Sequence, residues 1–299
     1  MIDRANSLAQ FSSALIERSA AANSAIAAIR LGENRHITGT LWRPGVVITS
    51  EQSLPDRDEF ELVIASGSTI RATTAGRDPG TNISVLKVEQ QSPAGVVPAV
   101  GQVGALAIAF GADANGHATV RLGVVNAVGP EWYSSHGGRI ERKVLLDIDL
   151  ARSEEGGPVF DAAGGFLGMS TFAPRRQVLV IPATTLERVV PILLKQGRIS
   201  YGWLGVALRP VAVPEALAKT AGQSSGLMVM SLTEGGPAVS AGVVAGDIIL
   251  SVDGASTRRM RNITARLGAD SIGRKIDLQL IRGGAVTSRQ VMITERPSS

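Results

Sequence analysis

The sequence of 299 residues contains no cysteine, which excludes disulfide bonds, a thiol nucleophile and a cysteine-ligated metal site. A chain without cysteine is compatible with reducing and oxidising compartments alike, so this absence does not locate the protein. Aromatic residues make up only 4% of the chain, whereas glycine contributes 34 residues. Few aromatics and many glycines favour short strands joined by tight turns over a helical bundle.

Long apolar runs are also missing. No segment approaches the roughly 18–20 apolar residues that a membrane-spanning helix needs, so we expect no transmembrane segment. The first 30 residues have no compact apolar core followed by a cleavage site, and we therefore expect no secretory signal in this sequence. Hydrophobic residues make up 44% and charged residues 19%, which is sufficient to build a buried core.

The formal net charge is +4, and the excess of basic residues lies after Tyr201. Its densest run is Arg258-Arg259-Met260-Arg261. Such a run can contact a phosphate or an acidic partner. A solvated loop or helix start is the simpler interpretation, and it is the one we adopt.

The order of apolar patterns predicts two strand-rich regions. Residues 7–30 carry Ala, Leu and Ile at three- and four-residue spacings, which predicts a helix leading into the first strand. A second helix is predicted over 183–196, where Gly197 offers a stop, and the domain boundary is expected in or just after 195–200. Short β-branched runs bounded by turn residues predict an antiparallel barrel or sandwich before this helix and a second strand-rich unit after it. The predicted strands are 45–50, 61–66, 82–88, 105–110, 121–128, 143–150, 157–160, 165–170, 177–182, 202–208, 226–232, 246–254 and 275–284, with short helices at 235–242 and 260–269 in the last region.

The most specific motif lies in the second region. Residues 235–254, GGPAVSAGVVAGDIILSVDG, resemble the signature of PDZ domains. The preceding Gly202-Trp203-Leu204-Gly205-Val206 resembles their carboxylate-binding loop, in which successive backbone N–H groups point at a peptide C-terminus. By this resemblance, a strand beside the loop pairs with the peptide, and the helix near Ile263 to Leu267 forms the other wall of the groove. A groove that is closed or internally occupied remains the alternative.

The first region resembles the HtrA/Deg family of trypsin-like proteases. The resemblance is carried by Thr38-Gly39-Thr40 with GVVITSEQSL, by residues 78–88 (DPGTNISVLKV), by 145–171 with its Gly-Gly-Pro, and by 180–197. It implies a mostly β protein: a chymotrypsin-like double six-stranded antiparallel β-barrel followed by an α+β PDZ domain. The expected domains are an N-terminal helical segment (1–30), a protease-fold domain (31–197) and a PDZ domain (198–299).

At the three catalytic positions that this resemblance implies, the residues are wrong for catalysis. Histidine is replaced by Gln52, aspartate by Asn82 and the nucleophilic serine by Glu155. Glutamine has no titrating nitrogen, asparagine lacks the charge that orients the base, and a carboxylate repels a developing oxyanion. We therefore expect a degenerate triad and no catalytic residue. The vestigial oxyanion loop is expected at Ser153, Glu154 and Gly156.

Other residues could supply the catalytic groups instead, but their spacing in the sequence gives this alternative little support. No pattern joins the remaining histidines to a serine, and the pair Glu154 and Glu155 is adjacent, so the two side chains are expected to point apart. The histidines also lack metal-ligand spacing, and we expect no metal and no cofactor. The residues in question are His36, His117 and His136, with Ser53, Ser84, Ser134 and Ser153.

These observations predict a non-catalytic HtrA-like pseudoprotease that binds protein or peptide C-termini through its PDZ domain, as a scaffold, adaptor or chaperone-like module. The alternatives are an HtrA-type endopeptidase with a rearranged site, another hydrolase that uses Glu155, and a regulatory subunit that joins an active relative in a mixed oligomer. The resemblance implies a homo-oligomer, a trimer, and an extracytoplasmic location. The lack of a signal in the sequence keeps the cytoplasm open, and we expect no nucleic-acid partner.

Overall fold

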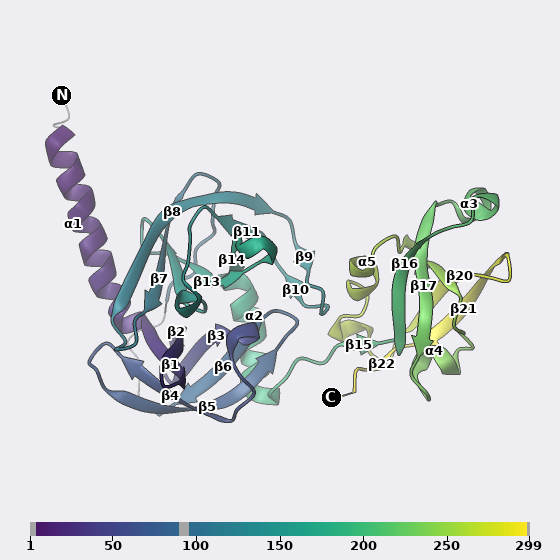
Figure 1. The fold of residues 1–299 in the computed structure, drawn as a ribbon, viewed down its shortest axis with the longest axis horizontal. Helices are drawn as coiled ribbons and strands as arrows, with labels where there is room; N and C mark the ends of the chain where they lie inside the picture. Colours follow the sequence, from purple (N-terminus) through teal and green to yellow (C-terminus); the bar gives the residue numbers. More distant parts are fainter. Residues whose placement is uncertain (1–3, 90–95, 298–299) are drawn as a thin grey trace. The chain divides into compact units, whose positions relative to one another are not determined.

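The computed structural model describes residues 4–89 and 96–297, and the chain divides by its internal contacts into two compact units (Figure 1). Unit 1 comprises Met1–Trp132 and Ile140–Ile199. Unit 2 comprises Tyr133–Arg139 and Ser200–Ser299. The first three residues of the expected N-terminal segment lie outside the described residues. Within the described ranges, no helix combines the length and apolar character needed to cross a bilayer.

The N-terminal helix is shorter than the sequence predicts. Helix α1 covers Arg4–Ala22, and the short 3-10 turn η1 (Asn23–Ala25) leads into strand β1 (Ile26–Gly32). The prediction of a helix up to residue 30 was therefore wrong over its last five residues. Ala27, Ala28 and Ile29 are good helix formers by pattern, but they are fully buried and pair with strands on both sides. Tertiary pairing overrides their local preference.

The first of two six-stranded barrels in unit 1 closes in the order β1-β2-β3-β6-β5-β4 (Figure 1). All neighbouring strands are antiparallel. Besides β1, its strands are β2 (Arg35–Arg43), β3 (Val46–Ser50), β4 (Glu59–Ile64), β5 (Thr69–Asp78) and β6 (Ile83–Val88). Alternate side chains from these strands fill the interior around the fully buried Leu62 and Leu86.

The second barrel closes in the order β11-β14-β13-β12-β7-β8 and is antiparallel throughout. Two closed antiparallel barrels of six strands each confirm the fold class predicted from the sequence. Its strands are β7 (Leu106–Ala112), β8 (Ala118–Gly129), β11 (Lys143–Leu146), β12 (Pro158–Asp161), β13 (Phe166–Phe172) and β14 (Val178–Pro182), and a small hairpin is formed by β9 (Trp132–Tyr133) and β10 (Arg139–Ile140).

Helix α2 (Ala183–Gln196) has the bounds that the sequence predicts. It ends at Gly197, whose φ of 75° is in the left-handed region that glycine adopts readily. The helix packs its apolar face, including Leu186, into a cluster that joins residues of both barrels. Strand β5 passes close to the helix end, because a Cβ atom on Gly76 would lie 2.7 Å from the carbonyl oxygens of Leu193 and Gly197.

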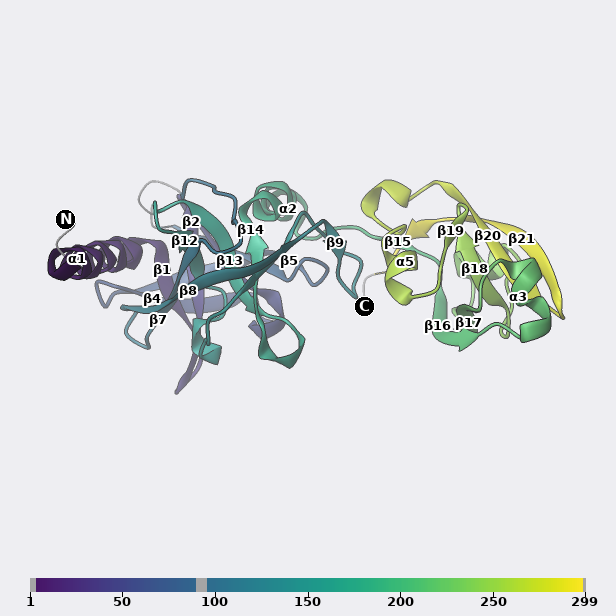
Figure 2. The same ribbon diagram turned by 90° about the horizontal axis from the view of Figure 1, so that it is seen from above.

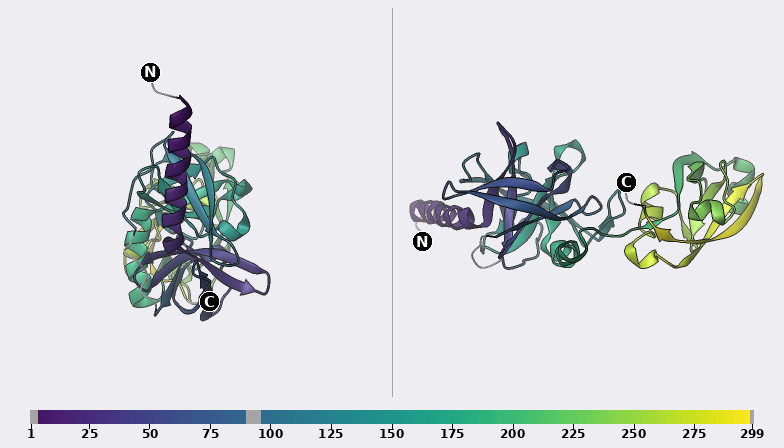
Figure 3. Two further views of the ribbon diagram at one scale, coloured as in Figure 1. Left: turned by 90° about the vertical axis from the view of Figure 1, so that its left-hand side faces the viewer. Right: turned by 90° about the horizontal axis from the view of Figure 1, so that it is seen from below.

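In Figures 2 and 3, α1 projects from the barrels of unit 1 as a single helix. Its apolar side chains Leu8, Phe11 and Ile16 are exposed, whereas Leu15 packs against a buried cluster of the barrel. Arg18 anchors the helix by donating a hydrogen bond to the Ala163 carbonyl at 2.8 Å. The described part of unit 1 therefore leaves much of the apolar surface of α1 uncovered.

Unit 2 contains an antiparallel sheet in the order β16-β17-β18-β20-β21, with β19 paired to β18. A separate two-stranded sheet is formed by β15 and β22, both labelled in Figure 1. The helices predicted at 235–242 and 260–269 are shorter, because glycines bound the first and the second continues only as tight turns to Leu267. The strands are β15 (Gly202–Trp203), β16 (Val206–Ala212), β17 (Ser225–Leu232), β18 (Ile248–Val252), β19 (Ala255–Ser256), β20 (Lys275–Arg282), β21 (Ala285–Met292) and β22 (Thr294–Glu295), and the helices are α3 (Glu215–Ala221), α4 (Pro237–Ser240) and α5 (Met260–Thr264).

Candidate functional site

The three residues at the expected catalytic positions meet at one point of unit 1. Gln52 lies in the 3-10 turn η2 (Glu51–Ser53) after β3, Asn82 directly precedes β6, and β3 and β6 are neighbours. The backbone N–H of Gln52 donates to Oδ1 of Asn82 at 2.8 Å. The Nε2 atom of Gln52 donates to Oε1 of Glu155 at 2.6 Å. The spatial constellation of a triad is thus present, but with an amide, an amide and a carboxylate.

The carboxylate of Glu155 is the centre of this constellation. The residue is 3% exposed and forms no ion pair with any residue that the structure describes. Four side chains donate hydrogen bonds to it instead: Ser50 at 2.8 Å, Gln52, Thr171 at 2.7 Å, and Ser53 to the second oxygen. Neutral donors therefore satisfy both carboxylate oxygens.

Asn82 is held by the same hydroxyl groups. Its Nδ2 atom donates to Oγ1 of Thr171 at 2.7 Å and to Oγ of Ser50 at 2.9 Å. Asn82 has a φ of 59°, a left-handed conformation that asparagine tolerates better than most residues. The preceding turn is fixed by Asp78, whose carboxylate accepts the N–H groups of Gly80 and Thr81.

Arg77 fixes the turn that carries Gln52. Its guanidinium pairs with Glu51 at 3.1 Å and donates to the carbonyl oxygens of Leu54 and Pro55 at 2.6 and 2.9 Å. The Arg77 side chain is only 19% exposed, so these bonds are largely shielded from water. The position of Gln52 is therefore set by a semi-buried network.

In the expected oxyanion loop, the amides that follow Ser153 are directed inward, whereas the Ser153 N–H has no backbone acceptor among the described residues. Residues Arg152–Glu154 form the 3-10 turn η3. The N–H groups of Glu154, Glu155, Gly156 and Gly157 donate to the carbonyls of Ala151, Arg152, Ser170 and Glu154, at 3.0, 3.4, 2.9 and 3.3 Å in that order. An oxyanion hole needs N–H groups that converge on open space. These four amides are already bonded within the protein.

The Glu154 side chain binds neighbouring residues and so fixes the conformation of the loop. Its buried carboxylate accepts hydrogen bonds from Nε of Arg121 at 3.0 and 3.1 Å, from Oγ1 of Thr119 at 2.8 Å and from the Ala151 N–H at 2.8 Å. The hydrogen bond and the charge of Glu154 raise the pKa of Arg121. Glu154 and Glu155 therefore point to different partners, and they do not form a paired acid and base.

Sequence reasoning missed Ser50 and Thr171, which hold the constellation together. Ser50 ends the apolar strand β3 and Thr171 lies near the end of β13, and both are buried. No spacing relates the two in sequence. The available signal was the occurrence of hydroxyl pairs at the ends of apolar runs, Thr49-Ser50 and Ser170-Thr171, where such groups need buried partners.

A cavity of about 920 Å³, the cleft cavity, opens beside Glu155. His36, Ser53 and Ser153 line it, but within the described ranges no hydrogen bond joins His36 to either serine, and its Nε2 atom is 3.0 Å from the Ala112 carbonyl oxygen. His117 lies 3.5 Å from Asp113. No group of three or more potential metal ligands occurs among the described residues.

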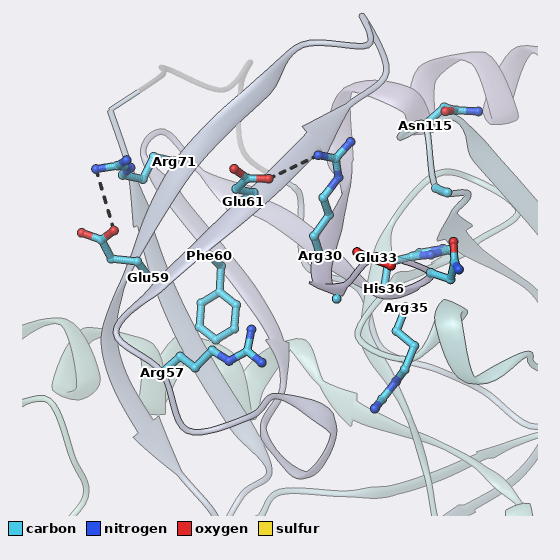
Figure 4. A pocket seen from close by; sticks show the side chains of 13 residues that line it. Arg30, Glu33, Arg35, His36, Arg57, Glu59, Phe60, Glu61, Arg71 and Asn115 are labelled. Carbon is cyan, nitrogen blue, oxygen red and sulfur yellow. Dashed lines mark hydrogen bonds and ion pairs between the residues drawn. The ribbon is translucent and has the colours of Figure 1, made fainter.

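A second cavity of about 880 Å³, the β1–β2 cavity, is shown in Figure 4. Two ion pairs cross its surface: Arg30 with Glu61 at 3.2 Å, and Arg71 with Glu59 at 3.8 Å. Asn34, Arg35 and His36 line both this cavity and the cleft cavity. The two cavities therefore adjoin at the start of β2.

In unit 2, the loop predicted to bind a carboxylate differs from the loop at residues 154–157: its carbonyls are bonded within the protein, and two of its N–H groups are not. The carbonyls of Leu204 and Gly205 accept the N–H groups of Ala238 and Thr233 at 3.0 and 2.9 Å. The N–H groups of Leu204 and Gly205 have no acceptor within the residues that the structure describes. Gly205 has a φ of 73°, and its missing side chain leaves the space beside the Trp203 ring. The loop therefore presents two unused amides.

The remaining predicted groove residues surround this loop. Leu204, Ile263 and Leu267 are buried in one cluster of unit 2, and Trp203 and Val206 are half-buried. The Gly202 N–H donates to the Leu267 carbonyl at 2.8 Å, which ties the loop to the chain after α5. Strand β16 is an edge strand of the sheet, so one side of its backbone is open to pairing.

Two family models match the two units. A model of the trypsin-like peptidase domain matches residues 37–169, and a PDZ domain model matches residues 202–293. The chain belongs to the HtrA/Deg family. The PDZ match includes the loop with the two unused amides, and the trypsin-like match includes Gln52, Asn82 and Glu155.

Relatives in this family are similar over most of the chain. A probable periplasmic serine endoprotease DegP-like of Brucella suis biovar 1 is 29% identical over 265 residues, 85% of this chain and 51% of that protein. Its counterpart from Chlamydia pneumoniae is 26% identical over 277 residues, 87% of this chain and 55% of that protein. The chain thus spans about half the length of the relatives that it matches in sequence.

Two solved structures share the HtrA fold. The HtrA-type protease AlgW with a decapeptide superposes with a TM-score of 0.74 at 21% identity, covering 95% of this chain and 99% of that one. A serine endoprotease from Yersinia pestis gives 0.71 at 22% identity, covering 94% and 98%. These likenesses extend through both the barrels and the PDZ domain.

Proposed function

We propose that this HtrA/Deg-family chain is a non-catalytic pseudoprotease that binds the C-termini of proteins or peptides through its PDZ domain. The observation that carries the proposal is the contrast between two loops. Four successive amides of the loop at Glu155 are bonded internally, whereas the amides of Leu204 and Gly205 are unused.

The lack of a basic nitrogen at the position expected for the catalytic histidine supports the proposal that the chain does not cleave peptides. Gln52 donates to Glu155 through an amide that has no basic nitrogen, and Asn82 carries no charge to stabilise a cationic base. In serine proteases with a Ser-His-Asp triad, replacing the aspartate alone with asparagine lowers turnover by about 10⁴. Here a carboxylate with four donors also occupies the place of the nucleophile.

The test of inactivity is degradation of casein at high protein concentration by the wild type and Glu155→Ala side by side. We expect no cleavage by either protein. Cleavage by the wild type alone would show that Glu155 takes part in chemistry. Cleavage by both, persisting after repurification, would favour a rearranged site, and Ser153→Ala and His36→Ala would then identify it.

The test of peptide capture is calorimetric titration with a library of C-terminal peptides and their amidated forms. Gly205→Ala places a Cβ 3.3 Å from the Trp203 ring on a left-handed backbone, so it is expected to weaken binding at least tenfold. Gly222→Ala is the matched control, since Gly222 also has a positive φ, of 66°, but nothing lies within 4 Å of its Cβ position. Binding that is equal for free and amidated peptides would contradict carboxylate recognition.

We base the proposed assembly and location on resemblance to the family. A trimer is expected, and the exposed Leu8, Phe11 and Ile16 on α1 support burial against another surface. Light scattering of the wild type and of a Leu8→Ser, Ile16→Ser variant tests this. The periplasmic names of the relatives support an extracytoplasmic location, which fractionation of cells expressing the complete gene would test.

A further inference from the structure

Four arginines around the two adjoining cavities of unit 1 have no acidic partner among the described residues. They are Arg35, Arg57, Arg152 and Arg176, here called the arginine rim. All four are exposed, and none forms an ion pair with any described residue. In Figure 4, no dashed line reaches Arg35 or Arg57, and the Arg35 side chain points away from Glu59 and Glu61.

Most acidic groups near the rim are already paired. Glu59 and Glu61 bind Arg71 and Arg30 across the β1–β2 cavity. Glu33, and Asp58 next to Arg57 in the sequence, are the exposed exceptions and form no ion pair among the described residues. In the cleft cavity, the buried carboxylate of Glu155 accepts hydrogen bonds from four neutral side chains. Neutral donors do not cancel the charge of a carboxylate, but four arginines against Glu33, Asp58 and Glu155 still leave the rim with a net positive charge.

The geometry of the rim fits an extended ligand. Arg35 lines both cavities, Arg57 lines the β1–β2 cavity, and Arg152 and Arg176 line the cleft cavity. Each cavity has a volume near 900 Å³, the upper part of the size range for ligand sites. A small anion would meet only part of the rim, whereas an extended chain can meet all of it.

The backbone at Arg176 adds a second observation. Arg175 and Arg176 have φ values of 64° and 59° in the turn between β13 and β14. Turns of this hand normally take glycine, asparagine or aspartate. Two arginines in such positions are held in a disfavoured conformation, and strain of this kind concentrates at sites that bind or react. Arg176 lies over the Phe172 ring at 5.7 Å, which orients its guanidinium at the cavity.

We propose that the arginine rim binds an extended acidic peptide segment along the two cavities, without cleaving it. Guanidinium groups recognise carboxylates through paired hydrogen bonds, and the apolar Leu31, Ile37 and Phe172 in the cleft cavity suit the side chains between them. This inference concerns unit 1 and holds whether or not the PDZ domain captures C-termini.

A peptide is favoured over a nucleic acid by the lack of exposed aromatic rings among the residues that line the cavities. Single strands bind through bases stacked on aromatic side chains. The aromatic residues lining the cavities are Phe60, which is 4% exposed, and Phe172, which is half-buried and covered by Arg176.

The test is fluorescence anisotropy of a labelled 12-residue peptide of alternating Glu and Ala. Its C-terminus is amidated, so that it offers no carboxylate to the PDZ loop. It is titrated at low salt with the full chain, next to a Gln-Ala peptide of equal length and a 12-nucleotide thymidine strand. The rim variant is Arg35→Gln, Arg152→Gln, Arg176→Gln. The control is Arg258→Gln, Arg259→Gln, Arg261→Gln, which removes equal charge from exposed positions of unit 2.

We expect the rim variant to bind the acidic peptide at least tenfold more weakly and the control within twofold of the wild type. Glu33→Gln is expected to tighten binding about two- to threefold, which a misfolded variant would not do. Loss of binding in both triple variants alike, no binding by the wild type, or tighter rim-dependent binding of the thymidine strand would each overturn the proposal.

Discussion

The amide of Gln52 donates to Glu155 at 2.6 Å, in the place where a serine protease has a base accepting a proton from a hydroxyl. The direction of the hydrogen bond is thus reversed. The amide holds the carboxylate, and the carboxylate holds Ser50, Ser53 and Thr171. This hydrogen-bond network, here called the Glu155 network, links the two barrels at the position expected for a catalytic triad.

Restoring the triad residues is expected to be insufficient for activity. In the triple variant Gln52→His, Asn82→Asp, Glu155→Ser, the N–H groups of residues 154–157 remain bonded within the protein. Loss of one oxyanion donor alone costs about 10²–10³ in turnover. Casein cleavage by this variant is therefore expected at least about 10²-fold below that of an active family member at equal concentration. Comparable cleavage would show that the loop rearranges readily on binding substrate.

Removing the carboxylate of Glu155 is expected to destabilise unit 1. Glu155→Ala leaves four side-chain donors without their acceptor, at an expected cost of about 1–3 kcal/mol in the free energy of unfolding. Glu155→Gln keeps the shape and should cost less. Urea denaturation measures both. Glu61→Ala, at a residue 64% exposed in its ion pair, is the control and should stay within about 0.5 kcal/mol. A more stable Glu155→Ala protein would mean that burying the charge outweighs its hydrogen bonds.

The ion pair of Asp247 with Arg282 predicts an acid-dependent stability of unit 2. Burial raises the pKa of Asp247, but the hydrogen bonds and charge of Arg282 and the Val244 N–H more than offset this, so its pKa is lowered. Because the folded-state pKa is depressed, the contribution is complete above the ordinary value of about 3.9 and is lost as the pH falls through the folded-state pKa.

Arg282→Gln is expected to lower the unfolding free energy by about 2–3 kcal/mol at pH 7, since Asp247 is fully buried and loses charged bonds of 2.6 and 2.8 Å. The deficit should shrink below about pH 4. Urea denaturation between pH 7 and 2 measures it, and Asp247→Asn should flatten the same pH dependence. A deficit that stays constant down to pH 2 would show that the pair contributes through packing alone.

The close approach of β5 to α2 can be tested by replacing single glycines with alanine. Gly76→Ala would put a Cβ 2.7 Å from two backbone carbonyl oxygens, and it is expected to cost about 1–3 kcal/mol of stability by overpacking. Gly32→Ala is the control, because it lies in the same barrel with nothing within 4 Å of its Cβ position. Thermal unfolding should separate the two variants by several degrees. Equal midpoints would mean that the helix end shifts freely.

Much of the fold could be predicted from the sequence, because its signals are local. The apolar face and terminal glycine of α2 fix its bounds, and short β-branched runs between turn residues mark most strands. The end of α1 could not be predicted, since Ala27 and Ala28 are strand residues only through pairing with β2 and β4. The resemblance to a protease family predicted that Gln52, Asn82 and Glu155 lie at one site. The roles of Ser50 and Thr171 and the inward amides of 154–157 arise from long-range packing, which no single segment encodes.

The hydrogen bonds of Glu155 also restrict which single mutations this protein can accept during evolution. A single mutation to serine at 155 would leave Gln52, Ser53 and Thr171 facing a shorter side chain, and the intermediate would lose stability before any activity returned. A single mutation of Gln52 to histidine would place an imidazole against a carboxylate that has no hydroxyl proton to give. If the chain is the pseudoprotease proposed above, the residues of the Glu155 network would have to change together, because the hydrogen bonds of the network oppose each single step toward a triad.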